Sequence, residues 1–407
     1  MSAPPKTDSG AAQAATWAAQ LDAWIRDHSL CGYDPFDIKQ HPWIRAAQPY
    51  PLLRKGTTAL CDVFPNALRA LLRIEPQHNA KAYALVALGR LRRFQATQDE
   101  AHLEGAFQCL DWLRGHATPG YAGLCWGYPF DVHAKGLDTP HDTPIVVVSA
   151  IAGEAFALAH DLTGDAAHVE AVRSIAEHVL ADIPRMRDDD GTVCFAYTPG
   201  DRRRVHNANL HAAAHLYRAY RLTGEASYRE QAEPALRFTL DRQRDDGAWP
   251  YGEYDSREPF EGSLMRIIDH HHTGFVLRSL HEIYGITHAE GIRRQIERGY
   301  AYYRNHLFEP DGMPVNDYGR YPVDIHACAE AILCPAVLAD WVPDALDLAA
   351  RSTDWTYRHL RDPRSGAVYH RKYPFFTARL IATRWGIAWV FRALCEYVFR
   401  AGYVRRP

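Results

Sequence analysis

The 407-residue sequence lacks the features by which several classes of protein are recognised. No stretch approaches about 18 uninterrupted apolar residues, so no membrane span is predicted. The N-terminus has no basic start followed by an apolar core, so no secretory leader is predicted. Lys and Arg number 46, Asp and Glu 49, and no basic run exceeds three residues. This balance gives no electrostatic case for nucleic acid or for an anionic membrane surface.

Paired cysteines are also missing. The eight cysteines are scattered and form no CxxC pair, so we expect them to be reduced and buried in a cytoplasmic protein.

Apolar residues make up 47% and aromatic residues 12% of the chain, which is enough for a packed core. No linker rich in Pro, Ser or Gly divides it, which predicts one domain over residues 1–407, with a flexible N-terminus at 1–10.

Apolar residues recur at helical spacing over most of the chain. In 288–307, Ile292, Ile296 and Tyr300 lie four residues apart and mark one face of a helix, and 166–182 has the same period. Strand-like alternation is confined to short loop segments. Gly-containing turns recur at intervals of 54 to 65 residues, which is the length of a helical hairpin with its connections.

These pairs predict an all-α fold, an (α/α)6 toroid of helical hairpins with short β-like loop segments. A helix at about 12–28 can supply the sixth outer partner. A linear solenoid is the competing arrangement, but the apolar helix at 385–399 needs cover on more than one side, which favours closure. The inner helices are predicted to begin near Asn79, Thr143, Asn207, His270, Ile325 and Arg384.

Unusual polar residues gather at these predicted helix starts. In a toroid the starts meet at one mouth, so side chains far apart in the sequence can contact one ligand. Capping is the alternative, since Asn, Thr and Asp satisfy free N–H groups at a helix start, but it does not explain the histidines. The candidates are His206, Asn207, Asn209, Asp269, His270, His271, His272, Asp324, His326, Arg384 and Trp385.

The three consecutive histidines need separate roles, because neighbouring side chains on a helix point about 100° apart and cannot share one ion. Asp269 can cap the helix, while His272, three residues on, can point into the mouth. His270 and His271 are expected to pack or to face solvent. Zinc would need ligands from other repeats, such as His206 and His326, and no HExxH motif is present. We therefore predict no metal and no cofactor.

Two loops before inner helices combine aromatic and acidic residues. Flat rings stack on the C–H faces of sugars, while carboxylates bind hydroxyl groups or move protons, so this combination suits a sugar site. The alternative is that the two tryptophans close the ends of the barrel. The residues are Trp126, Tyr128 and Asp131 in the first loop and Trp249, Tyr251 and Glu253 in the second.

Two cyclase families share local features with the chain. The stretch 238–249, FTLDRQRDDGAW, resembles the Q-x3-G-x-W repeat of squalene-type terpene cyclases, which are α/α toroids. Their acidic DxDD-type motif is absent, so the resemblance supports the toroid and not the terpenoid chemistry. The CWG at 125–127 is similar to that of lantibiotic cyclases, whose zinc-binding Cys-His partner is absent here.

Seven motifs spread over almost the whole chain carry a wider resemblance. They are GYDPFD (32–37), CWGYPFD (125–131), YTPGDRRRVHNANL (197–210), DGAWPYGE (246–253), IDHHHTGF (268–275), YPVDIHA (321–327) and RWGIAW (384–389). With these motifs the chain resembles a bacterial family found in capsular and exopolysaccharide biosynthesis clusters. The IDNFHTGF pattern of that family matches Asp269 and His272 and departs at His270 and His271. The resemblance implies the toroid of six-hairpin glycosidases, uronate epimerases and lyases, with a glycan substrate.

The expected function is acid/base chemistry at a sugar carbon of a glycan or glycan precursor. In a hydrolase, two carboxylates flank the scissile bond, chosen from Glu253, Asp269, Asp324 and Asp131. In an epimerase or lyase, His272 or His326 removes a proton, Arg384 holds a uronate carboxylate and Tyr251 serves the opposite face. A glycan- or partner-binding scaffold is the non-enzymatic alternative. A terpenoid cyclase is disfavoured by the polar mouth.

Overall fold

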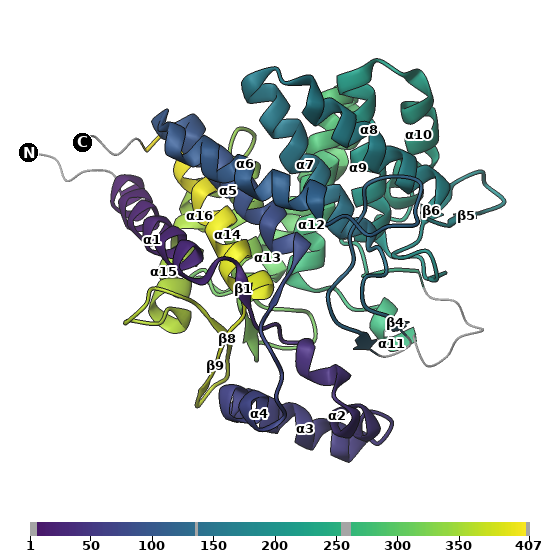
Figure 1. Cartoon of the computed structure of the whole chain (residues 1–407). Helices are drawn as coiled ribbons and strands as arrows, with labels where there is room; N and C mark the ends of the chain where they lie inside the picture. Colours follow the sequence, from purple (N-terminus) through teal and green to yellow (C-terminus); the bar gives the residue numbers. More distant parts are fainter. Residues whose placement is uncertain (1–5, 135–136, 254–261, 404–407) are drawn as a thin grey trace, which may run out of the picture.

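Helical hairpins follow one another along the chain and arrange themselves in two layers (Figure 1). The computed structural model describes residues 6–134, 137–253 and 262–403. In this part of the chain six inner helices are α5 (Ala80–Thr97), α7 (Val146–Thr163), α9 (His206–Thr223), α12 (His270–Thr287), α14 (Ile325–Val337) and α16 (Ala388–Arg400). Their outer partners are α6 (Glu100–Gly115), α8 (Ala166–Ala181), α10 (Ala226–Leu240), α13 (Glu290–His306), α15 (Ala345–Leu360) and α1 (Lys6–His28).

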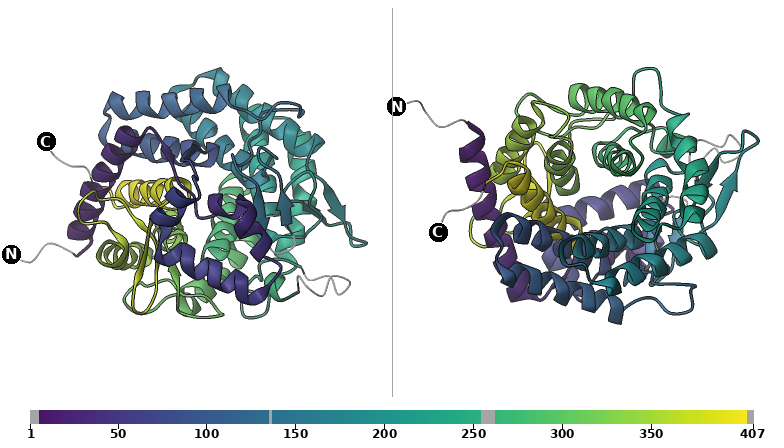
Figure 2. Two further views of the ribbon diagram at one scale, coloured as in Figure 1. Left: turned by 60° about the horizontal axis from the view of Figure 1, so that its bottom comes forward. Right: turned by 90° about the horizontal axis from the view of Figure 1, so that it is seen from above.

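The ring of inner helices is closed. Each inner helix packs against the next, and α16 returns to pack against α5 (Figure 2, right). The helix α1 packs against α16 and α15 and so supplies the sixth outer helix. The predicted (α/α)6 toroid is therefore confirmed, and a linear solenoid is excluded. Of the N-terminus predicted to be flexible, residues 1–5 lie outside the described residues, and α1 begins at Lys6.

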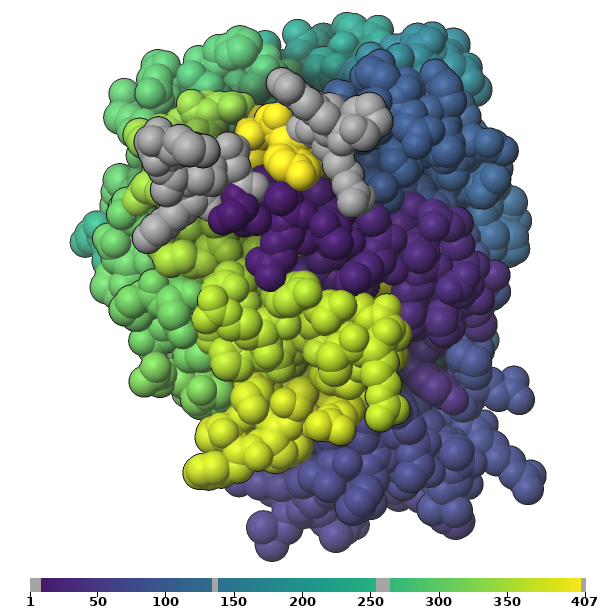
Figure 3. Space-filling view, turned by 90° about the vertical axis from the view of Figure 1, so that its left-hand side faces the viewer, coloured from purple at the N-terminus to yellow at the C-terminus, as the bar shows by residue number. Residues whose placement is uncertain are grey.

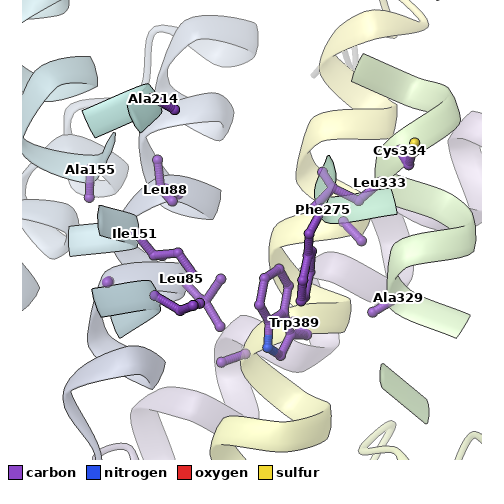
Figure 4. Close-up of a cluster of buried hydrophobic side chains, with 14 of the residues drawn as sticks. Leu85, Leu88, Ile151, Ala155, Ala214, Phe275, Ala329, Leu333, Cys334 and Trp389 are labelled. Carbon is purple, nitrogen blue, oxygen red and sulfur yellow. The ribbon is translucent and has the colours of Figure 1, made fainter. Parts of the chain in front are cut away.

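The core lies inside this ring, where apolar side chains of all six inner helices meet (Figure 4). Phe275 of α12 stacks on Trp389 of α16 with ring centroids 5.3 Å apart.

Among the described helices, α7 alone is long and apolar enough to cross a membrane, but 67% of it is buried inside the protein. Its composition is that of a helix surrounded on all sides by other helices.

Local residue choices set the helix ends. Gly164 and Gly224 close α7 and α9 in the left-handed conformation, with φ of 72° and 74°, which glycine adopts without a Cβ penalty. Asn79 caps α5 by accepting a hydrogen bond from Lys81 N. The start of α7 differs from the prediction, since Ile145 precedes its first residue, whereas α9 begins at His206, one residue before the predicted Asn207.

The described strands are short and connect the helices at the mouth. A helical insertion between β1 and β2 comprises η1 (Asp37–Gln40), α2 (Pro42–Ala47), α3 (Pro51–Val63) and α4 (Pro65–Leu71). The short helix α11 spans Gly262–Met265, and a π-helical turn at Thr383–Ile387 leads into α16. The antiparallel strands are β1 (Cys31–Gly32) with β2 (Gln77–His78), β3 (Val132–Ala134) with β4 (Leu137–Thr139), β5 (Arg185–Arg187) with β6 (Val193–Phe195), and β7 (Val323–Asp324) with β8 (Tyr369–Lys372) and β9 (Thr377–Ile381).

Candidate active site

A cavity of about 220 Å³ opens at the end of the toroid where the inner helices begin. Its wall comes from distant parts of the chain: the loops before α7 and α9, the first turn of α12 and the turn before α16. Aromatic rings and hydrogen-bonding groups share this wall. The side chains are Phe36, Tyr128, Val132, Thr139, Ile145, Tyr197, Thr198, Arg203, Tyr251, Leu264, His271, His272, Arg384 and Trp385.

An aspartate–histidine pair contributes His272 to this wall, with Asp269 buried behind it. Asp269 is the N-cap of α12, and one of its oxygens accepts a hydrogen bond from His272 N at 2.8 Å. The other oxygen lies 2.6 Å from His272 Nδ1. An ionised carboxylate can only accept, so in the neutral ring Nδ1 carries the proton and Nε2 keeps a lone pair. This arrangement gives His272, whose side chain is 22% exposed, the geometry of a general base facing the cavity.

The charge state of the pair follows from its surroundings. Burial alone would raise the pKa of Asp269, but the His271 and His272 rings and the hydrogen bonds from His272 outweigh burial and hold this pKa well below its usual range. Burial lowers the pKa of His271 to about 4, so that ring is neutral at neutral pH. His271 was expected to pack or face solvent, and it is half-buried while its ring lines the cavity. His270 packs against Tyr303.

The two arginines of the wall are already paired with aspartates. Arg384 makes a bidentate contact with Asp34, at 2.6 Å from Nε and 2.8 Å from Nη2. Its Nη1 donates to the hydroxyl of Tyr128 at 3.2 Å. Arg203 contacts Asp201 through Nε and Nη2. The guanidinium of Arg384 therefore orients Tyr128, and since Tyr128 oxygen accepts this bond, its own proton is available to a ligand.

Two candidates from α14 lie behind the cavity and not on its wall. Asp324 caps α14 through His326 N at 2.9 Å and also accepts from Trp385 Nε1 at 2.7 Å and Arg371 Nε at 2.8 Å. Although burial opposes it, Arg371 lowers the pKa of Asp324 to about 2. His326 is buried among aromatic rings, with its ring centroid 4.2 Å from that of Trp385. This burial holds the pKa of His326 well below 6.5. Asp324 thus orients Trp385.

The candidates of α9 also lie beside the cavity. His206 Nε2 is 3.1 Å from Glu253, and this contact lowers the pKa of Glu253. Asn209 connects Phe195 N at 3.0 Å with Ala235 O at 2.7 Å. Asn207 is buried in the first turn of α9. None of these side chains is among the described residues of the cavity wall.

The tryptophans of the two loops are buried in equivalent ways. Trp126 Nε1 donates to Leu113 O at 3.0 Å, at the end of α6. Trp249 Nε1 donates to Thr239 O at 2.8 Å, at the end of α10. Each ring therefore seals the C-terminus of an outer helix. Asp131 accepts from the backbone and the ring of His141 and does not line the cavity, whereas Tyr128 and Tyr251 of the same loops do.

One group in the described part of the chain has the composition of a metal site. Ligand atoms of Asp269, His271 and His272 lie within 4.8 Å of one another. Two histidines and one carboxylate are a donor set that divalent transition metals accept, although His272 Nδ1 and one Asp269 oxygen are already engaged with each other at 2.6 Å. His206 and His326 are not part of this group.

A larger cavity, about 310 Å³, lies at the opposite end of the toroid. Arg92, Arg218 and Arg278 line it, each joined to a glutamate at 2.6 to 2.7 Å. Buried charges that are matched in this way hold neighbouring helices together and leave little net field for a ligand. No aspartate–histidine pair is present in its described wall. The smaller cavity is the better candidate for an active site.

Several residues of the site were not singled out from the sequence. Tyr197, Thr198 and Arg203 lie in the motif YTPGDRRRVHNANL, and Asp34 and Phe36 lie in GYDPFD. Both motifs were among those on which the family resemblance is based, so the sequence did mark these segments. A single sequence does not indicate which of their side chains point into the cavity.

No protein-family model matches the chain, and no curated protein matches its sequence. Solved structures match its fold at low identity. A cellobiose 2-epimerase from Bacillus thermoamylovorans has a TM-score of 0.63 at 12% identity, covering 79% of this chain and 87% of that one. An unsaturated glucuronyl hydrolase from Streptococcus agalactiae has 0.60 at 13%, covering 98% and 93%. A sugar epimerase from a ruminal bacterium has 0.62 at 13%, covering 80% and 89%. The fold is therefore the (α/α)6 toroid of these proteins.

Proposed function

We propose that the protein is a carbohydrate-active enzyme that moves a proton at a sugar carbon, as an epimerase, isomerase or lyase does. The observation that carries the proposal is His272, paired with Asp269, on the wall of an aromatic cavity. A base fixed in one tautomer beside stacking rings suits a C–H bond of a sugar. The cavity is smaller than the roughly 300–1,000 Å³ of drug-sized sites, which suits a single sugar ring at the reacting position.

In the proposed step, His272 Nε2 takes the proton from a carbon next to a carbonyl or carboxylate group. The electron pair of the broken C–H bond moves onto the neighbouring oxygen, and Tyr128, oriented by Arg384, donates a hydrogen bond to that oxygen. Return of a proton to the other face inverts the carbon, and Tyr251, whose ring is 4.5 Å from His272, lies close enough to take part. Arg384 acts here through Tyr128, since its guanidinium is bound to Asp34.

Glycoside hydrolysis is the second form of sugar chemistry to be tested. It requires two carboxylates at the reacting centre, and the described wall of the cavity contains none. Glu253, bound to His206, is the candidate carboxylate beside it. Hydrolysis therefore needs a larger rearrangement of the site than proton transfer does.

The biological setting is part of the same proposal. The resemblance to proteins of capsular and exopolysaccharide clusters supports a glycan or glycan precursor as substrate and a cytoplasmic location. The fold neighbours named as sugar epimerases and as a glucuronyl hydrolase support carbohydrate chemistry on this scaffold. At identities of 12% to 13% these neighbours say nothing of the particular substrate, which is proposed from the cavity and the motifs.

A pair of variants tests the proposed base. On a sugar that the protein converts, His272→Asn is expected to lower kcat by about 10²- to 10⁴-fold, the usual contribution of a general base. His288→Asn is the matched control, since His288 is an exposed histidine at the end of the same helix with φ of 52°, which Asn tolerates. Equal activity of the two variants contradicts the assignment. An unchanged sugar across a panel of neutral and acidic oligosaccharides favours the binding scaffold.

A further inference from the structure

Large apolar side chains are exposed on one part of the molecule. Among the described residues, twelve large hydrophobic side chains are exposed, and eight of them lie between Trp43 and Leu71 on α2, α3 and α4. Two more, Phe375 and Phe376, lie between β8 and β9. Monomeric soluble proteins seldom gather such residues without a partner. The most exposed of the insertion are Trp43, Tyr50, Leu52, Leu53, Phe64 and Leu71.

The helices that carry these side chains are firmly attached on their other side. Arg69 of α4 is fully buried and contacts Asp37 at 2.7 Å and Asp34 O at 2.7 Å. Asp62 of α3 is buried, and the hydroxyl of Tyr373 donates to it at 2.5 Å. The exposed apolar side is therefore presented by a fixed scaffold. We call this surface, formed by α2–α4 and residues 373–376, the insertion face.

The insertion face lies at the mouth of the toroid. The insertion leaves the ring after β1 and returns at β2, directly before α5 begins, and β9 leads into the turn before α16. The helices α3 and α4 contact β9, and Figure 3 shows these two parts of the chain next to each other at the bottom of the molecule. Phe36, directly before η1, lines the candidate active site. The insertion face and the opening of the cavity thus lie at the same end of the toroid.

The charges on the insertion face have one sign. Within 42–73, Arg45, Lys55 and Arg73 are exposed and Arg54 is half-exposed. The only acidic residue in this range, Asp62, is buried. The balanced charge of the whole chain predicted no anionic membrane surface as partner, but the local distribution differs from that average. Apolar side chains mixed with cations alone complement an anionic lipid surface, where each Lys or Arg adds attraction.

We propose that the insertion face docks on an anionic phospholipid bilayer and holds the protein there as a peripheral protein. Leu, Trp and Phe side chains enter the boundary between head groups and acyl chains, and the flanking cations contact lipid phosphates. A symmetric contact of this face with that of a second copy would bring cations together, because 42–73 exposes no acid. If the proposed function also holds, the mouth faces the bilayer, and a sugar on a lipid carrier can enter it from the membrane surface.

Sedimentation of the full chain with vesicles tests the proposal. Binding is expected to phosphatidylcholine vesicles that contain phosphatidylglycerol, much less to phosphatidylcholine alone, and to weaken as salt is added. Leu52→Ser is expected to reduce the partition coefficient roughly tenfold. Lys55→Gln is expected to reduce it roughly fivefold. Arg294→Gln, an exposed arginine of α13 on the outer ring, is the matched control and should bind as the wild type does.

Three results would overturn the proposal. The first is no sedimentation with phosphatidylglycerol vesicles at low salt. The second is binding that Leu52→Ser and Lys55→Gln leave unchanged. The third is a dimer, seen by analytical ultracentrifugation without lipid, that Leu52→Ser dissociates, since the insertion face would then be an interface between copies. These measurements need no substrate, so their outcome is independent of the proposed enzymatic activity.

Discussion

Replacing Asp269 by Asn separates its two roles, because capping and tautomer control need different atoms. Asn caps a helix as well as Asp does, so its oxygen can still accept from His272 N. Its amide nitrogen then takes the place of the second oxygen, now 2.6 Å from Nδ1. An amide N–H requires Nδ1 to accept, which moves the proton of His272 to Nε2. The base would be lost while the helix start is kept.

The expected loss in kcat/KM for Asp269→Asn is about 10²- to 10⁴-fold, the usual contribution of a general base. This corresponds to about 3–5 kcal/mol of transition-state stabilisation. The free energy of unfolding should fall by only about 1–3 kcal/mol, from the weaker hydrogen bonds of an uncharged partner. Asp269→Ala should be as inactive as Asp269→Asn. It should be less stable than the Asn variant by about 1 kcal/mol, since it also removes the cap.

The measurement combines steady-state kinetics with urea unfolding followed by circular dichroism. Asp165→Asn is the matched control, because Asp165 caps α8 by accepting from Ala167 N at 2.9 Å and lies far from the cavity in the fold. It should leave activity unchanged. Activity of Asp269→Asn within about threefold of wild type would refute the role given to this pair, since the loss expected of a general base is at least about 10²-fold.

Three further predictions concern packing, pH and metal. Gly274→Ala should cost about 1–3 kcal/mol of stability, because the new Cβ would lie 2.3 Å from Glu330 Cγ. Gly285→Ala, at an exposed position of the same helix, should stabilise the protein slightly. Thermal unfolding that finds Gly274→Ala more stable than Gly285→Ala contradicts the close contact between Gly274 and Glu330. His271, with pKa of about 4 against 6.5 when unfolded, should cost about 3 kcal/mol of stability as pH falls from 6.5 to 4. Asp324, with pKa of about 2, adds a loss from about pH 4 downward. A urea midpoint that stays constant from pH 6.5 to 4 argues against the first loss, and one that stays constant below pH 4 argues against the second. A chelator should leave turnover unchanged, and activity that is lost and then restored by zinc would instead favour the Asp269, His271 and His272 metal group.

Hydrophobic periodicity was enough to predict the ring of helices. The predicted starts at His270 and Ile325 coincide with the first residues of α12 and α14, because an aspartate before each helix gives a clear capping signal. The start near Thr143 was placed three residues early, since α7 begins after an isoleucine that has no capping side chain. Closure could be inferred because the apolar inner helices require cover on all sides.

The candidate site was only partly predictable. Asp269 with His272 followed from helix geometry, but both His271 and His272 line the cavity, although adjacent side chains diverge. The salt bridge between Asp34 and Arg384 joins residues 350 positions apart, and no local pattern in one sequence indicates such a contact. The helices α2–α4 were not predicted, because they are short and expose apolar residues that a periodicity argument would assign to a core.

Incubation with sugars in D2O, followed by mass spectrometry, tests the proposed proton transfer most directly. The expected result is a gain of one mass unit in a sugar that is not cleaved or, for a lyase, cleavage without addition of water. Either reaction should be catalysed by the wild type and by His288→Asn but not by His272→Asn. Cleavage with addition of water and no deuterium at carbon would contradict proton abstraction by His272. That outcome would assign the chemistry to a carboxylate such as Glu253.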